Sequence, residues 1–180
     1  MNKIYLLLGS NMGNSKKMLL LAANEIEKSI GKIIRESNFY QTAAWGKTDQ
    51  ADFLNQVIIV DSKYAAEETI EKILQIESTM GRIRTQKNAP RLIDIDILFF
   101  NKEIIKLKSL IVPHIEIQNR RFVLVPLNEL SPNFKHPVLN KTIHQLLLNC
   151  PDKLEVKKKL IILTIFAFIL QLNEIQFCNY

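Results

Sequence analysis

Hydrophobic residues in the first hundred positions gather into short runs that are separated by polar turns. These runs are rich in Ile, Val, Leu and aromatic residues, which favour β-strands. We predict four strands, at residues 3–8, 32–40, 53–61 and 92–100. Two intervening segments, residues 42–52 and 82–90, have neither a strand nor a helix period and are expected to be loops.

Two longer segments have helical spacing instead. Apolar residues recur on one face of residues 15–29, at Met18, Leu19, Ala22 and Ile26. Residues 65–80 repeat the pattern with Ile70, Ile73, Leu74 and Ile76, while their acidic residues take the opposite face. Ser15 is the expected N-cap of the first helix, and Gly31 and Gly81 are expected to end the two helices.

The predicted order is therefore β-α-β-β-α-β, which is the split βαβ, ferredoxin-like α+β arrangement with two helices on one face of a sheet. Beyond residue 100 we expect a hairpin around Asn101-Lys102, a loop with Pro113-His114, and short helices near residues 121–129 and 142–148. We expect one domain over residues 1–150 and a C-terminal extension of unknown role over residues 151–180.

The extension contains an apolar run, Leu160–Leu170, directly after Lys157–Lys159. The run is shorter than the roughly 20 residues that span a bilayer. We expect it to pack against the domain or to self-associate, and contact with a membrane surface is the third alternative. At the other end, the apolar run after Lys3 is too short for a secretory signal.

Composition narrows the function classes only modestly. The chain has 180 residues, of which 47% are hydrophobic and 23% charged, so it can build a core and is not a disordered protein. Its net charge of +6 favours an anionic partner such as a nucleotide, a nucleic acid or a membrane surface. Cys150 and Cys178 are too few for a disulfide framework, so we expect a reducing, cytoplasmic location.

The strongest chemical feature is a pair of carboxylates inside the last predicted strand. Asp94 and Asp96 alternate with Ile93, Ile95 and Ile97, so the two acids share one face of the strand. Two like charges held this close are costly without a cation, and Mg²⁺ usually takes one or two carboxylates together with substrate phosphates. The alternative is an exposed pair on a solvated sheet face, which the poor strand propensity of Asp disfavours.

A cationic loop precedes this strand. Within ten residues it places Arg82, Arg84, Lys87 and Arg91, with no acidic residue among them. Arginine forks beside a diacidic metal site suit the transfer of a phosphoryl or pyrophosphoryl group, although a solvated charged loop or a nucleic-acid patch remains open for the loop alone. The chain has no Walker A pattern, so Gly9-Ser10-Asn11 is interpreted as a structural turn rather than a P-loop.

Further downstream, His114, Arg120 and Arg121 form a third polar cluster, and the aromatic residues Trp45, Phe53 and Phe122 together with Asn55 could build a slot for a flat heterocycle. Ordinary core packing is the alternative for these aromatics.

At these residues the chain resembles the 6-hydroxymethyl-7,8-dihydropterin pyrophosphokinase family. The signature-like stretch runs from Lys87 through Pro90-Arg91 to Asp94 and Asp96. Supporting motifs stand in order over residues 3–148: Gly9-Ser10-Asn11, Phe39-Tyr40-x-Thr42, Asp52-Phe53-Leu54-Asn55, Glu77 with Gly81-Arg82-Ile83-Arg84, Val112-Pro113-His114, Asn119-Arg120-x-Phe122 and His136-Pro137.

The resemblance implies transfer of the pyrophosphoryl group from ATP to the pterin hydroxymethyl group, with two Mg²⁺ ions bound by Asp94 and Asp96. Arg82 and Arg91 would share catalysis with the two aspartates. The implied ATP site consists of Glu77, Arg82, Arg84, Arg91, Ile97, His114 and Arg120. The implied pterin site consists of Thr42, Ala43, Trp45, Phe53, Asn55 and Phe122.

The chain departs from the family pattern at three places near the nucleotide. Asn88 stands where some members have Trp, Leu92 replaces the usual Thr, and Ser109 stands where some members have Arg, with Lys106 and Lys108 close by.

Two other classes of protein remain as alternatives. A basic ferredoxin-like sheet can bind RNA, but the aromatic pattern of RNA-recognition strands is missing and two aspartates on a central strand would repel phosphates without a metal. A regulatory domain that binds a ligand without turnover is the second. We therefore expect ATP and the pterin as small-molecule partners, no nucleic acid, and a monomer or weak homo-oligomer.

Overall fold

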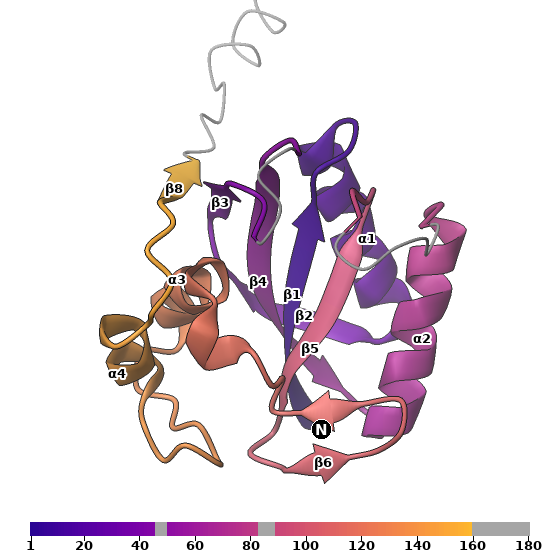
Figure 1. The fold of residues 1–180 in the computed structure, drawn as a ribbon. Helices are drawn as coiled ribbons and strands as arrows, with labels where there is room; N and C mark the ends of the chain where they lie inside the picture. The colour runs from indigo at the N-terminus through magenta and orange to yellow at the C-terminus, as the bar shows by residue number, and fades with distance from the viewer. Residues whose placement is uncertain (46–49, 83–88, 160–180) are drawn as a thin grey trace, which may run out of the picture.

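A computed structural model of the chain describes residues 1–45, 50–82 and 89–159 (Figure 1). Its elements follow one another as β1 (Asn2–Ser10), α1 (Ser15–Ser29), β2 (Gly31–Glu36), β3 (Phe39–Thr42), β4 (Phe53–Ser62), α2 (Ala66–Thr79), β5 (Asp94–Phe100), β6 (Ile105–Lys106), β7 (Ile111–Val112), a 3₁₀ turn (Ile117–Asn119), α3 (Arg121–Leu130), α4 (Ile143–Leu148) and β8 (Val156–Lys159).

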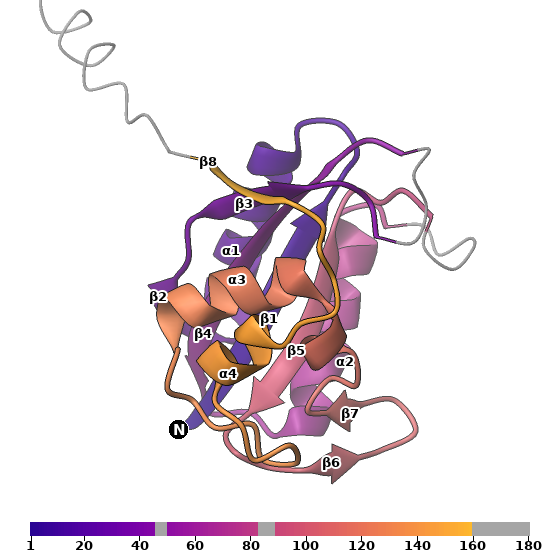
Figure 2. The same cartoon turned by 60° about the vertical axis from the view of Figure 1, so that its left-hand side comes forward.

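Six of the described strands form one antiparallel sheet. The order is β5-β1-β4-β3-β8, and β2 pairs with β4 beside β3. Helices α1 and α2 cover one face, and α3 and α4 lie over the other (Figure 2). The predicted ferredoxin-like α+β fold is confirmed, and the second helical layer adds a third tier to it.

The central strand β1 is buried on both faces because a helical layer covers each of them. Ile4, Leu6 and Leu8 pack toward α1 and α2, whereas Tyr5 and Leu7 pack toward α3 and α4. A strand that is covered on both sides needs an unbroken apolar run, which is what residues 4–8 provide.

Strand β5 contains a bulge at Leu98. Leu6 pairs with Ile97 and Tyr5 pairs with Phe99, so Leu98 has no opposite residue on β1. Before the bulge, Ile95 and Ile97 join the core under α1 and α2; after it, Leu98 and Phe99 both join the core under α3 and α4. The carbonyl of Leu98 accepts a hydrogen bond from the backbone N–H of His114 at 3.1 Å.

The predicted strand over residues 32–40 is wrong as a single element. It divides into β2 and β3 at Ser37, whose hydroxyl accepts from the N–H of Val57 at 3.0 Å and whose carbonyl accepts from Gln56 Nε2, also at 3.0 Å. Ser37 thereby takes over contacts to β4 that a regular ladder would make, and the chain bends there while both halves stay paired with β4.

Two predicted helix boundaries are also corrected. Asn14, not Ser15, caps α1, because its side chain accepts from the N–H of Lys17 at 3.0 Å. Gly31 begins β2 instead of ending α1, and a Cβ there would stand 2.2 Å from the carbonyl oxygen of Asp61. Gly81 follows α2 with φ of +84°, as expected of a helix stop.

The predicted hairpin around Asn101-Lys102 is displaced. Those residues form a turn that leaves β5, and the hairpin itself consists of β6 and β7, with the link between Leu107 and Leu110 closing its loop. The short helices near residues 121 and 143 are confirmed as α3 and α4, and Thr142 and Gln145 form a capping box at the start of α4.

The beginning of the C-terminal extension belongs to the sheet. Strand β8 pairs antiparallel with β3, with Val156 opposite Thr42 and Lys159 opposite Phe39. The apolar run Leu160–Leu170 lies outside the described residues. Within the described ranges, none of the helices is long and apolar enough to cross a bilayer.

Removing residues 152–180 is expected to lower the Tm by several degrees and to leave a folded, active domain. The deletion removes the ladder between β8 and β3, the ion pair between Lys158 and Glu129 at 3.3 Å, and the hydrogen bond from the N–H of Arg121 to Asp152 at 3.0 Å. Thermal melting and turnover would be compared with those of a chain that ends at Lys159. Loss of cooperative melting in the shorter chain alone would show that β8 is indispensable to the core.

Candidate active site

Two adjoining cavities open at the end of β5 where Asp94 lies. The first has a volume of about 210 Å³ and the second about 500 Å³. Four residues line both of them: Arg82, Asp94, Asp96 and His114. The diacidic strand predicted from the sequence therefore forms the boundary between the two cavities.

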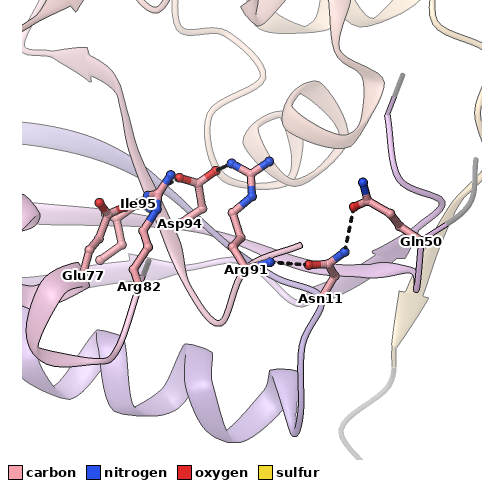
Figure 3. Close-up of polar contacts among 7 residues, drawn as sticks. All are labelled: Asn11, Gln50, Glu77, Arg82, Arg91, Asp94 and Ile95. Atoms are coloured by element: carbon pink, nitrogen blue, oxygen red, sulfur yellow. Dashed lines mark hydrogen bonds and ion pairs between the residues drawn. The ribbon is translucent and has the colours of Figure 1, made fainter. Parts of the chain in front are cut away.

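The alternation predicted for β5 is confirmed at this point. Ile93, Ile95 and Ile97 are buried in the core under α1 and α2, and the two aspartates face the cavities. Their environments differ, because Asp94 forms two ion pairs. Its Oδ1 lies 2.5 Å from Arg82 Nη1, and its Oδ2 lies 2.5 Å from Arg91 Nη1 (Figure 3).

Glu77 supports this arrangement from α2. Its carboxylate is only 2% exposed, accepts the backbone N–H of Ile95 at 2.8 Å, and is paired with Arg82 (Figure 3). Glu77, Arg82, Asp94 and Arg91 thus alternate in charge along one chain of contacts. This alternation holds two arginine side chains at the cavities with little freedom to reorient.

Within the part of the chain that the structure describes, Asp96 forms no comparable ion pair. Burial raises its pKa to about 7, with the negative charge of Asp94 adding to the shift. The guanidinium of Arg120 acts in the opposite direction but does not cancel it. A carboxylate that is partly desolvated beside another carboxylate suits a divalent cation, so the donor set fits Mg²⁺.

The stability difference between Asp96→Asn and wild type should depend on pH in the absence of metal. Because the folded-state pKa of Asp96 is raised, its ionisation disfavours folding progressively as the pH rises from about 4 to about 7. The variant should therefore melt several degrees above wild type at pH 8 and level with it below about pH 4. Melting curves in chelator at pH 4, 6 and 8 test this, and a constant difference across the series would contradict it.

The first cavity has aromatic walls and a polar end. It contains all six residues of the implied pterin site, namely Thr42, Ala43, Trp45, Phe53, Asn55 and Phe122. Asn55 Nδ2 donates to Thr42 Oγ1 at 3.0 Å, and Asn55 is 2% exposed. Gly9 lies opposite Asn55, and a Cβ there would stand 3.1 Å from Asn55 Oδ1, so a larger residue would require the Asn55 side chain to shift.

Arg120 lies in the aromatic cavity rather than in the second one. Its guanidinium is 5.1 Å from the ring centre of Trp45 and 5.9 Å from that of Phe122, which are cation–π distances. Arg91 stacks similarly on Phe53, at 5.4 Å. These contacts tie the predicted phosphate-binding arginines to the aromatic walls.

His114 faces both cavities as a neutral imidazole. Burial lowers its pKa, and the charge of Arg120 lowers it further. Its Nδ1 accepts the N–H of Glu116 at 3.2 Å, so the ring proton resides on Nε2, where it can be donated to an anionic ligand.

The remaining predicted residues have three different outcomes. Glu77 and Ile97 line the second cavity, and so do Lys108 and Ser109, whereas Lys106 does not. Arg84, Lys87 and Asn88 lie outside the described residues. Leu92 packs beside the turns at Gly13 and Gly81, because Cβ atoms placed on those glycines would stand 4.0 and 3.5 Å from its methyl groups.

Sequence reasoning did not single out Leu7 and Gln50, which also line the first cavity. Leu7 belongs to a buried strand, so nothing in its pattern marks it as a wall residue. Gln50 stands in a loop without periodicity, where only its polar side chain could have drawn attention.

Comparison with known proteins gives three concordant results. Residues 5–132 match the family described as 7,8-dihydro-6-hydroxymethylpterin-pyrophosphokinase (HPPK). A Dictyostelium discoideum protein named folic acid synthesis protein FOL1 is 37% identical over 152 residues, which cover 84% of this chain and 23% of that protein.

Two bacterial relatives have nearly the length of the matched region. Both are named 2-amino-4-hydroxy-6-hydroxymethyldihydropteridine pyrophosphokinase. The Methylorubrum extorquens protein is 37% identical, with 74% of this chain and 85% of that protein covered. The Aquifex aeolicus protein is also 37% identical, with 81% and 90% covered.

Among solved structures, wild-type Plasmodium falciparum HPPK-DHPS with pteroate has a similar fold, with a TM-score of 0.69 at 22% identity. The match covers 82% of this chain and 42% of that one. The signature residues around the two cavities, the family match over most of the chain and the two bacterial relatives agree: the chain belongs to the 7,8-dihydro-6-hydroxymethylpterin-pyrophosphokinase family.

Proposed function

We propose that the first cavity binds the pterin, the second binds ATP, and the reaction takes place at their boundary beside Asp94 and Asp96. The chain is a pyrophosphokinase of folate biosynthesis, as its family is. It transfers the pyrophosphoryl group of ATP to 6-hydroxymethyl-7,8-dihydropterin and releases AMP. The observation that carries the site assignment is the pair of carboxylates shared by one aromatic and one larger cavity.

The aromatic cavity suits a flat heterocycle. Phe53 and Phe122 offer ring faces for stacking, and Asn55 and Thr42 offer amide and hydroxyl groups that can read the edge of a pterin. Ala43 and Trp45 complete the wall. This placement directs the hydroxymethyl group of the pterin toward the aspartates.

The arginines and His114 bind the phosphates. Arg82 and Arg91 present their guanidinium groups at the boundary between the cavities, and His114, which lines both cavities, offers its Nε2–H. Glu77 holds Arg82 from behind, and Ile97 contributes apolar surface to the ATP side. Arg84 and Arg120 complete the proposed ATP set, and Arg120 would leave its stacking position on Trp45 to do so.

Two Mg²⁺ ions are proposed at Asp94 and Asp96. Bound there with the triphosphate, they would supply neutralisation of charge on its bridging oxygens. The chain's own residues orient the reactants. The pterin hydroxyl oxygen attacks the β-phosphorus in line and its proton passes to solvent, while the bond from that phosphorus to the α-phosphate oxygen breaks and AMP leaves with the electron pair. Arg82 and Arg91 stabilise the charge that develops on the transferred group.

The decisive experiment is a product assay with purified protein, Mg²⁺, ATP and the pterin. We expect AMP to form only when both substrates are present, with no ADP. Formation of ADP, or of AMP without pterin, would contradict the proposal. A ligand-binding domain without turnover would give neither product, and a nucleic-acid module would show no dependence on pterin.

We further propose a cytoplasmic location and a monomer or weak homo-oligomer with no nucleic-acid partner. Support for a reducing compartment comes from Cys150, which is a buried free thiol.

A further inference from the structure

Asn11 connects the two loops that flank the site, although it lines neither cavity. It follows β1 directly and is 6% exposed. The sequence alone suggested only a structural turn at this position. Its contacts reach residues 80 and 40 positions away in the chain, which a local turn does not require.

One set of contacts fixes the backbone of Arg91. Asn11 Oδ1 accepts the N–H of Arg91 at 2.8 Å, and the N–H of Asn11 donates to the carbonyl of Arg91 at 3.1 Å. Both backbone polar groups of Arg91 are therefore held by one residue. Figure 3 shows the first of these bonds, from the N–H of Arg91. The guanidinium that extends from this point pairs with Asp94 at the cavity boundary.

The other set reaches the loop on the pterin side. Asn11 Nδ2 donates to Gln50 Oε1 at 3.3 Å and to the carbonyl of Ala51 at 3.2 Å. Gln50 lines the aromatic cavity. The side chain of Asn11 therefore links a residue of the cavity wall to the backbone of Arg91 (Figure 3). An amide is the side chain that can accept on one side and donate on the other.

We propose that Asn11 is a positioning residue. It holds Arg91 in place for pyrophosphoryl transfer, and it couples occupancy of the pterin cavity to the position of Arg91. The inference rests on the proposed function of the two cavities. A displacement of about 1 Å in a group that binds the phosphates costs roughly 10²-fold in rate, so loss of the Asn11 contacts should lower turnover measurably. Because Asn11 lines neither cavity, nucleotide affinity should change little.

The test compares Asn11→Ala and Asn11→Asp with Asn14→Ala. Asn14 lies in the same turn and also bonds to a backbone N–H, that of Lys17 at 3.0 Å, but it reaches neither loop. The aspartate variant keeps an acceptor for the N–H of Arg91 and loses the donor to residues 50 and 51. It therefore separates the two sets of contacts and serves if the alanine variant fails to fold.

The measurements are kcat, both KM values, the Tm, and the Kd of the pterin with and without a non-hydrolysable ATP analogue. For Asn11→Ala we expect kcat to fall about 10- to 100-fold, KM for ATP to stay within about threefold, and the effect of the analogue on pterin Kd to disappear. Asn11→Asp should keep more of kcat and still lose that coupling. Asn14→Ala should lower only the Tm.

Contrary outcomes are distinct. If both Asn11 variants keep the wild-type kcat and coupling, or lose activity only in proportion to their Tm as Asn14→Ala does, the inference is wrong. If wild type binds pterin equally well with and without the analogue, the coupling is wrong. If wild type neither binds the pterin nor forms AMP, the proposed function fails instead.

Discussion

Asp96→Asn is expected to lower turnover at saturating Mg²⁺ by about three orders of magnitude or more. The substitution removes a negative oxygen at the boundary of the two cavities, where charge compensation at the β-phosphorus is needed. A metal contribution of several kcal/mol to the transition state corresponds to a loss of roughly this size. Turnover would be measured across a Mg²⁺ titration, so that weakened metal affinity is separated from a lower maximal rate.

Asp94→Asn is the matched comparison, because the two aspartates differ in their partners. Its turnover should fall by a similar factor, but its metal-free Tm should also fall, since it loses charge pairing with both Arg82 and Arg91. Asp96→Asn should instead melt above wild type at pH 8. Near-normal turnover in either variant would mean that the carboxylates have a structural rather than a catalytic role.

Arg91→Ala is expected to lower kcat about 10²- to 10³-fold while KM for ATP changes by less than about threefold. The guanidinium is already oriented by Asp94 and Phe53 before substrate enters, so its donors act where charge develops rather than adding general affinity. The fold should survive, because Asp94 keeps its pair with Arg82. Steady-state kinetics with each substrate varied in turn provide the measurement.

Two further variants control this experiment. Arg91→Lys keeps the charge but not the planar fork, and it should recover only a small part of the lost rate. Arg121→Ala removes an arginine next to Arg120 that lines neither cavity, and it should leave kcat unchanged. A rise in KM for ATP with unchanged kcat in Arg91→Ala would mean that this arginine only binds the ground state.

The parts of the fold that sequence patterns predicted are those with a local cause. The helical spacing of residues 15–29 and 65–80 and the alternation of Ile93, Asp94 and Ile95 depend on near neighbours in the chain. The division of residues 32–40 into β2 and β3 depends on Ser37 bonding to β4, about twenty residues away. Strand β8 was missed because Val156-Lys157-Lys158-Lys159 has no apolar pattern of its own and forms by pairing with an existing edge.

The candidate site divides in the same way. Residue types and spacing marked the aspartates, the arginines and a possible aromatic slot, and the resemblance to a family assigned that slot to the pterin. Neither could show that Arg120 stacks on Trp45, because a long side chain from a loop takes its direction from the surfaces around it. The hydrogen bonds of Asn11 could not be predicted from the sequence either, because each of its partners is distant in the chain.

The unpaired residue Leu98 in β5 decides which residues of this strand face each helical layer. On one side of Leu98 the odd-numbered residues enter the core beneath α1 and α2; past it, even-numbered Phe100 does. Deleting Leu98 would remove the bulge and leave Ile97 opposite Leu6 and Phe99 opposite Tyr5, so both faces would keep their residues. Deleting Ile95 would instead make Asp94 and Asp96 adjacent in the strand, where adjacent side chains take opposite faces. A change of length between the two aspartates should therefore be harder to tolerate than one at the bulge, where the deletion of Leu98 would chiefly remove the carbonyl that accepts from the N–H of His114.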